Sequence, residues 1–179
     1  MTKSHLLRIF NADDAIELPV KVQEVLDSDG RDEIFKELIH AYNADMSYDW
    51  FQSIYEEELA QRKQNKQDFT PRAVSQLCSG IVGAHHSVHE PTAGNGSMII
   101  ADWWSTASKM LPWEFQFLRY RVDCWELSDR AIPILLLNLA IRGIVGVVHH
   151  GDVIEGTEKA RYILSCNDVL SFSKIAKVI

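Results

Sequence analysis

The sequence predicts an α/β fold in which a helical N-terminal segment precedes a sheet of parallel strands. Short apolar stretches near 86–91, 119–126 and 144–148 alternate with longer stretches of helical periodicity near 97–110 and 129–142. Strands that are separated by helices connect as right-handed crossovers, which makes the neighbouring strands parallel. The length of 179 residues fits one such domain with a small helical addition.

The first part of the chain is expected to be helical. Apolar residues recur at helical spacing over 20–26 and 34–42, and Asp49 is suited to cap a third helix. A polar run then leads into the alternating strand and helix pattern. We therefore divide the chain into an N-terminal helical region, 1–66, and an α/β domain, 67–179.

The α/β domain is expected to begin with a helix that has Thr70 as its N-cap and Pro71 in its first turn. A fourth strand is expected near Arg161–Leu164, and a final short helix over Phe172–Val178. The sheet would then hold three or four parallel strands.

Composition limits the classes of function. The net charge of −7 argues against tight, autonomous binding to nucleic acid. No apolar run reaches the ~18 residues of a membrane span, and the N-terminus lacks the layout of a signal peptide, so we expect a cytoplasmic protein without a membrane partner. The three cysteines are far apart and lack CxxC spacing, which favours reduced thiols over disulfides or a zinc site.

Five histidines are grouped near two of the predicted strands, but their spacing is not typical of a metal site. The doublets His85-His86 and His149-His150 place neighbouring side chains on opposite faces of a strand, as period-two alternation requires. We therefore expect exposed or supporting histidines and no metal. Cys124, within a predicted strand, is expected to be buried.

The most informative segment is the turn that joins the first predicted strand to the next helix. Glu90 ends the strand, and Pro91–Gly96 forms a turn of small residues before a helix that begins near Ser97. Glycines permit unusual backbone angles and close approach of a ligand, and a helix start offers free N–H groups. The pattern is not the GxGxxG of a dinucleotide site, and the carboxylate of Glu90 disfavours a pyrophosphate.

Two further acidic residues are predicted at the same edge of the sheet. Glu126 ends the second strand, where a carboxylate can accept two ribose hydroxyls, and Asp152 follows the third strand, where it can accept an exocyclic amine of adenine. Ligands of open parallel sheets bind beyond the carboxyl ends of the strands. Three carboxylates around one turn favour a cationic ligand such as S-adenosylmethionine.

Five segments in this order resemble a known family. They are Phe69-Thr70-Pro71, Glu90–Ser97, Trp125-Glu126-Leu127, Asn138–Gly143 and Gly151-Asp152. Together they resemble the N6-adenine DNA methyltransferases, and in particular the modification subunit of type I restriction-modification systems. The resemblance covers roughly residues 42–155. It implies a shortened Rossmann-like methyltransferase sheet that binds S-adenosylmethionine.

The resemblance also implies roles for individual residues. The segment around Phe69 and the Glu90–Ser97 turn would hold the methionine part of the cofactor, Glu126 the ribose and Asp152 the adenine. The implied cofactor contacts are Phe69, Thr70, Pro71, Glu90, Pro91, Thr92, Ala93, Gly94, Asn95, Gly96, Ser97, Glu126, Leu127, Asp152 and Val153.

The sequence departs from the family at the catalytic motif. The family carries an Asn/Asp-Pro-Pro-aromatic loop after its fourth strand, which binds the target amine and stacks on the flipped base. Here Asn167 offers an amide oxygen after the predicted fourth strand, but no proline or aromatic residue follows it. Two functions therefore remain open: a DNA adenine methyltransferase with Asn167 or another polypeptide supplying the base-binding groups, and an inactive cofactor-binding module that regulates a DNA-modification complex. A small-molecule methyltransferase is a third, weaker interpretation.

The shortened sheet also predicts partners. In the family's order the fourth strand lies beside the first, and later strands extend that side. Without them, an edge and an apolar face of the sheet would be uncovered. We expect a second copy of the chain, or a second methyltransferase or specificity subunit, to cover them, with DNA reached through the partner.

Overall fold

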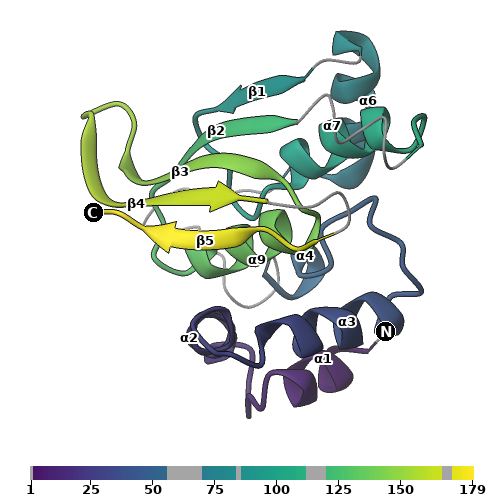
Figure 1. The fold of residues 1–179 in the computed structure, drawn as a ribbon, viewed down its shortest axis with the longest axis vertical. Coiled ribbons are helices and arrows are strands. Elements are labelled where there is room, and N and C mark those ends of the chain that lie inside the picture. Colours follow the sequence, from purple (N-terminus) through teal and green to yellow (C-terminus); the bar gives the residue numbers. More distant parts are fainter. Residues whose placement is uncertain (1, 56–69, 84–85, 112–119, 167–170) are drawn as a thin grey trace.

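The computed structural model describes residues 2–55, 70–83, 86–111, 120–166 and 171–179, and it has an α/β architecture with a five-stranded mixed sheet (Figure 1). The strands lie in chain order across the sheet. They are β1 (Ser87–Glu90), β2 (Arg121–Glu126), β3 (Val145–Asp152), β4 (Thr157–Ser165) and β5 (Lys174–Lys177). The first three strands are parallel to one another, as predicted.

The N-terminal part of the chain is helical, as the apolar repeats predicted. Its helices are α1 (Lys3–Ile9), α2 (Leu18–Leu26), α3 (Arg31–Ala41) and the short α4 (Gln52–Ile54). The prediction for Asp49 was wrong, because Phe51 is the N-cap of α4 and no side chain caps it. Asp49 is 3% exposed and has a structural role that is described with the site below.

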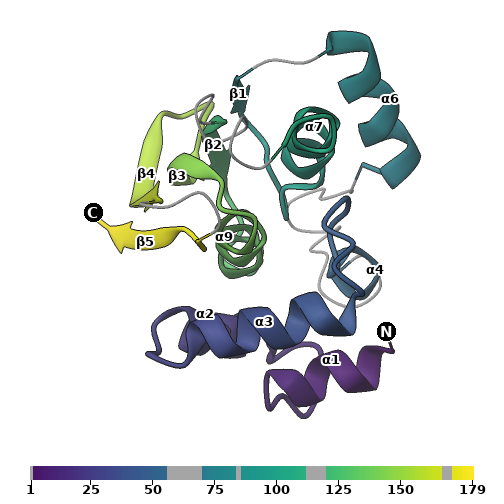
Figure 2. The same ribbon diagram turned by 45° about the vertical axis from the view of Figure 1, so that its right-hand side comes forward.

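Three helices follow among the described residues of the second part of the chain: α6 (Arg72–Val82), α7 (Ser97–Ala107) and α9 (Ala131–Ile141). Pro71 is the N-cap of α6 and no side chain bonds to the first turn, so Thr70 is not the cap that the sequence suggested. In the rotated view, α6, α7 and α9 all lie on one side of the sheet (Figure 2). Along β2, buried Val122 and Cys124 alternate with exposed residues, and Cys124 is buried as expected.

The C-terminal part of the sheet differs from the prediction. The fourth strand exists, but β4 is antiparallel and lies beside β3 rather than beside β1. The physical reason is the short connection of 153–156, because a parallel crossover needs a dozen or more residues.

The predicted final helix over Phe172–Val178 is also wrong. The segment contains β5, which pairs antiparallel with β4 and brings Ala176 opposite Ile163. A short apolar run does not distinguish a helix from a strand by its periodicity. In this segment the backbone hydrogen bonds to β4 favour a strand over a helix.

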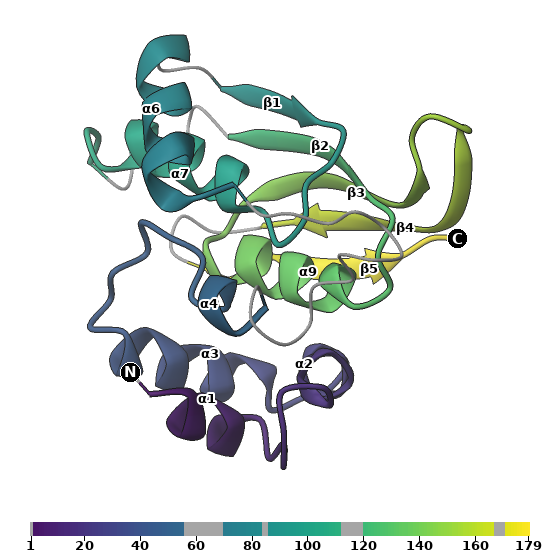
Figure 3. The same cartoon turned by 180° about the vertical axis from the view of Figure 1, so that it is seen from behind.

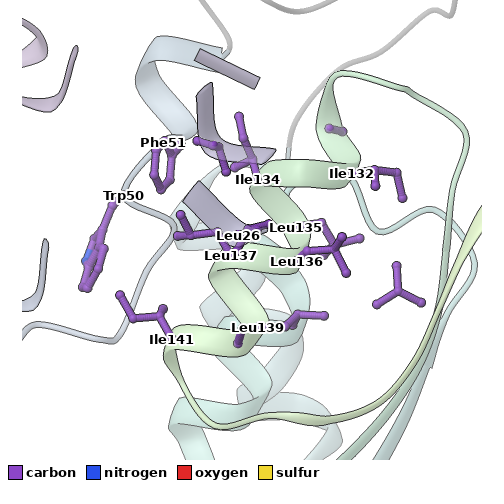
Figure 4. Close-up of a cluster of buried hydrophobic side chains, with 14 of the residues drawn as sticks. Leu26, Trp50, Phe51, Ile132, Ile134, Leu135, Leu136, Leu137, Leu139 and Ile141 are labelled. Atoms are coloured by element: carbon purple, nitrogen blue, oxygen red, sulfur yellow. The ribbon is translucent and has the colours of Figure 1, made fainter. Parts of the chain in front are cut away.

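One hydrophobic core joins the two parts of the chain. Every residue of α9 is buried, because the helix lies between the sheet and the N-terminal helices (Figure 3). Trp50 and Phe51 face α9 from the N-terminal side, and Leu26 of α2 reaches the same cluster (Figure 4). The continuous core fixes the N-terminal helices against the sheet.

A substitution at Gly146 tests whether β2 and β3 pair as described. Its φ is 145°, and a Cβ there would lie 1.9 Å from the carbonyl oxygen of Val122. We expect Gly146→Ala to lower the free energy of unfolding by at least ~2 kcal/mol in urea denaturation followed by circular dichroism. The matched control is Gly80→Ala in α6, where no atom lies within 4 Å of the added methyl and the helix should gain roughly 0.5–1 kcal/mol. If the Gly146→Ala protein were as stable as the wild type, the register of β2 against β3 would be contradicted.

Candidate functional site

A cavity of about 710 Å³ lies where the carboxyl ends of β1, β2 and β3 meet the side of α6. The residues that line it are Thr70, Val74, Cys78, Glu90, Pro91, Thr92, Ala93, Gly94, Ser97, Met98, Glu126, Leu127, Gly151, Asp152, Val153 and Ile154. The three carboxylates predicted to converge therefore share one cavity. Its volume is in the range of small-molecule sites.

The turn before α7 has the backbone that the glycines predicted. Gly94 has a φ of 55°, and Gly96, the N-cap of α7, has a φ of 90°. A Cβ on Gly96 would lie 2.9 Å from Cδ1 of Leu135, so the glycine also permits close packing on α9. The turn is held to β2 because the Ala93 N–H donates to the carbonyl of Trp125 at 2.8 Å.

Glu126 holds the turn in place from the end of β2. Its Oε2 accepts a 2.7 Å hydrogen bond from the Gly94 N–H, and its Oε1 accepts one of 2.7 Å from the Ser128 N–H. The side chain is 7% exposed. The carboxylate thus organises the cavity wall, and it stands among the residues that line the cavity.

The other two carboxylates shape turns of their own. Oε1 of Glu90 accepts from the Thr92 N–H at 3.1 Å. Oδ1 of Asp152 accepts from the N–H groups of Ile154 and Glu155, at 2.9 and 3.1 Å, and so forms the turn between β3 and β4. Both side chains combine a local structural role with a place in the cavity wall.

A buried polar network fixes the glycine turn from behind. The Nδ2 of Asn138, in α9, donates to Oδ1 of Asp49 at 2.8 Å and to the carbonyl of Asn95 at 2.9 Å. Oδ1 of Asp49 also accepts from the Phe51 N–H at 2.9 Å. The network therefore connects the N-terminal region, α9 and the turn of the candidate site.

Arg142 completes this network. Its guanidinium donates to the carbonyls of Asn138, Met46 and Tyr48 at 2.8, 3.0 and 2.6 Å. Burial lowers the pKa of Arg142 to about 10, and it raises the pKa of Asp49 above its usual value. Nearby Asp49 offsets part of the cost of burying the cation, as paired buried charges do.

The cavity presents acidic groups and hydrogen-bond donors to a ligand. No lysine or arginine stands among the residues that line it in the described part of the chain. The hydroxyl of Ser97 is buried and has no hydrogen-bond partner among the described residues. The first N–H groups of α7 have no acceptor within their own helix. The cavity is therefore lined by hydrogen-bond donors as well as by carboxylates. This chemistry suits a polar ligand that carries positive charge.

Most of the predicted cofactor contacts line the cavity. Thr70, Leu127 and Val153 do so, together with Pro91, Thr92 and Ala93. Pro71, Asn95 and Gly96 are not part of the lining: Asn95 is 1% exposed and supports the turn from behind. Phe69 and Asn167 lie outside the described residues.

Sequence reasoning missed several residues of the site. Val74 and Cys78, one helical turn apart in α6, form an apolar wall, and Met98 and Ile154 add to it. It also missed the part that Asp49 and Asn138 play in supporting the turn. The role of Asn138 could have been predicted, because it is a single polar residue within the otherwise apolar run 131–141, and a buried polar group needs a hydrogen-bond partner.

His149 and His150, in β3, each pair with side chains of neighbouring elements. The His149 ring stacks on Trp125 with centroids 4.4 Å apart, and its Nδ1 contacts Glu158. Burial lowers the pKa of His150, whose Nε2 lies 2.9 Å from Asp129. Within the described ranges, no group of three or more His, Cys, Asp or Glu side chains is arranged to hold a metal ion.

No family model and no curated protein matches the sequence. Among the helices of the described ranges, none has the length and apolar character needed to cross a membrane. The assignment of a function therefore depends on the cavity and its chemistry.

Glu126 should contribute to stability even without a ligand. Glu126→Ala removes the acceptors of two backbone N–H groups, and we expect it to lower the free energy of unfolding by roughly 2–4 kcal/mol. Glu126→Gln keeps one acceptor oxygen and should cost about half as much. The control is Glu155→Ala, an exposed carboxylate outside the cavity. Equal stability of the wild type and Glu126→Ala in chemical denaturation would show that the carboxylate does not hold the turn.

Proposed function

We propose that this protein binds S-adenosylmethionine in the 710 Å³ cavity and belongs to a DNA adenine modification system. The single observation that supports the proposal most is the convergence of Glu90, Glu126 and Asp152 around the glycine turn. A sulfonium and an ammonium group both carry positive charge, and the wall of the cavity offers carboxylates to them.

Each part of the ligand has a suitable group on the wall. Glu126 lines the cavity at the end of β2, where a carboxylate can accept from ribose hydroxyls, and Asp152 offers its Oδ2 to the exocyclic amine of adenine. Glu90, the free N–H groups of α7 and the hydroxyl of Ser97 are placed for the amino-acid part, whose ammonium and carboxylate need an acceptor and donors. Val74 and Cys78 offer apolar contact with the carbon atoms of the ligand.

The charge of the cavity argues against a dinucleotide or nucleoside triphosphate. Phosphate groups are commonly bound by lysine, arginine and free N–H groups, and three carboxylates at one turn repel them. The lining described above contains the carboxylates without a basic side chain. A methyl donor with positive charge is the better fit.

The assignment to DNA adenine modification rests on the sequence resemblance over roughly residues 42–155. It implies that the target base enters beside the cofactor and is held by polar and aromatic groups. The net charge of −7 favours a partner that supplies most of the contact to DNA. We infer that the chain acts as one subunit of such a system.

A second candidate function is an inactive cofactor-binding module. The observation that favours it is the position of β4, which forms a hairpin with β3 and lies away from β1. In the described residues no strand pairs with the other side of β1, where the base-binding loop of a complete methyltransferase would be expected. Such a module would bind the methyl donor and regulate a modification complex.

Calorimetric titration tests cofactor binding. We expect S-adenosylmethionine to bind and NAD and ATP not to bind. Glu90→Gln keeps an acceptor for Thr92 but removes a negative charge, so it should weaken binding by roughly tenfold, and less at high salt. Glu155→Gln, which lies outside the cavity, is the matched control. Binding of ATP in preference to S-adenosylmethionine would reject the proposal.

Transfer of a labelled methyl group separates the two candidate functions. We expect no transfer to DNA by the chain alone, and transfer once a partner that carries a base-binding loop is added. Loss of transfer with Glu90→Gln in that mixture would assign the cofactor site to this chain. Cofactor binding without transfer in any combination would leave only the regulatory module.

A further inference from the structure

Helix α6 has its apolar side chains on the exposed side. The residues that it buries are Ser75 and Ser79, and the hydroxyl of Ser79 donates to the carbonyl of Ala101 in α7 at 3.3 Å. On the other side, three large side chains are exposed at helical spacing: Val74 by 44%, Leu77 by 63% and Ile81 by 77%. We call these three residues the α6 stripe. A helix on a protein surface normally has the reverse arrangement.

The segment of the chain that contains the α6 stripe is also free of charged residues. The sequence contains no Asp, Glu, Lys or Arg between Arg72 and Glu90, although the whole chain has a net charge of −7. Exposed helices of soluble proteins usually carry charged residues on their outer side. An uncharged, apolar outer side is typical of a surface that another protein covers.

The α6 stripe lies at the same end of the molecule as the edge strand β1. Both views show β1 as the outermost strand, with α6 at the same end and the N-terminal helices at the opposite end (Figures 1 and 3). Among the described residues, β1 pairs only with β2, so its other edge carries unpaired backbone groups. Parallel strands are usually covered on both sides, and an open edge offers a template for another strand.

We propose that two copies of this chain associate through this end of the molecule. The β1 edges pair antiparallel around a two-fold axis, and the α6 stripe of one copy packs against the α6 stripe of the other. A two-fold axis brings the same surface of each copy together, and an apolar surface is complementary to itself. This inference does not depend on the proposed function.

The area available agrees with this arrangement. Three side chains of this size and exposure offer on the order of 300 Å² of apolar surface on each copy. A stable interface buries roughly 800 Å² on each partner. The α6 stripe would therefore supply somewhat more than a third, and the edge of β1 with its flanking residues would supply the rest. Neither feature is sufficient alone, but both lie at the same end of the molecule (Figure 1).

Charge favours a second copy at this position. Two molecules with a net charge of −7 repel one another over most of their surfaces, and the repulsion is weakest where both surfaces are uncharged. The segment between Arg72 and Glu90 meets that condition on both copies. Because Val74 lies in both the α6 stripe and the cavity wall, association would also enclose one side of the cavity.

Sedimentation velocity of the full chain tests the proposal. We expect a dimer at micromolar concentration, and we expect Leu77→Glu to weaken it by roughly a hundredfold or more, because symmetry places the new charge in the interface twice. Ile81→Glu is a second variant at a still more exposed position, should Leu77→Glu fail to fold by circular dichroism. Ile16→Glu is the matched control, since Ile16 is 61% exposed and comes just before α2, which lies at the opposite end of the molecule.

Hydrogen exchange gives an independent measurement. The N–H groups of Ser87–Glu90 that face away from β2 should become protected as the concentration rises, and they should lose this protection in Leu77→Glu. A wild-type chain that stays monomeric at every concentration tested overturns the proposal. This holds even if the same surface binds a different protein. A dimer that persists in both glutamate variants, or that Ile16→Glu weakens equally, overturns it as well.

Discussion

The contact between Asn138, Asp49 and the glycine turn is the constraint on which the rest of the structure depends. One amide group, at the centre of a helix that is otherwise apolar, donates to the carboxylate of Asp49 and to the carbonyl of Asn95. Burying such groups is costly unless each is paired, so the three segments are held in one arrangement. Arg142 adds contacts to Met46 and Tyr48, and the N-terminal region thereby becomes part of the support of the candidate site.

The cavity is consequently held from two directions. From behind, Asn138 fixes the carbonyl of Asn95, and from the end of β2, Glu126 fixes the N–H groups of Gly94 and Ser128. The left-handed backbone at Gly94 and Gly96 is maintained by these contacts without any ligand. A turn that is already ordered loses little conformational entropy on binding, which favours affinity for a small ligand.

The sequence was sufficient for features that depend on local chemistry. The parallel arrangement of β1, β2 and β3, the glycine turn and the shared position of Glu90, Glu126 and Asp152 all follow from strand and helix alternation with acidic residues at strand ends. It was not sufficient for β5, where four residues take their conformation from pairing with β4. Nor did it show Asp49 bonded to Asn138, because that contact joins residues far apart in the chain.

The position of β4 links the site to the outer surface of the protein. Because the connection after β3 is too short for a crossover, β4 and β5 extend the sheet only on the side of β3. The other side ends at β1, so the strand that begins the glycine turn is also an edge strand, and α6 lies at the same end of the molecule with apolar side chains exposed. The cavity therefore opens next to an end of the described structure at which residues 73–89 carry no charge and the apolar side chains of α6 are exposed. A molecule that packed there would act directly on the wall formed by Val74 and Cys78, and its binding would be coupled to that of a ligand in the cavity.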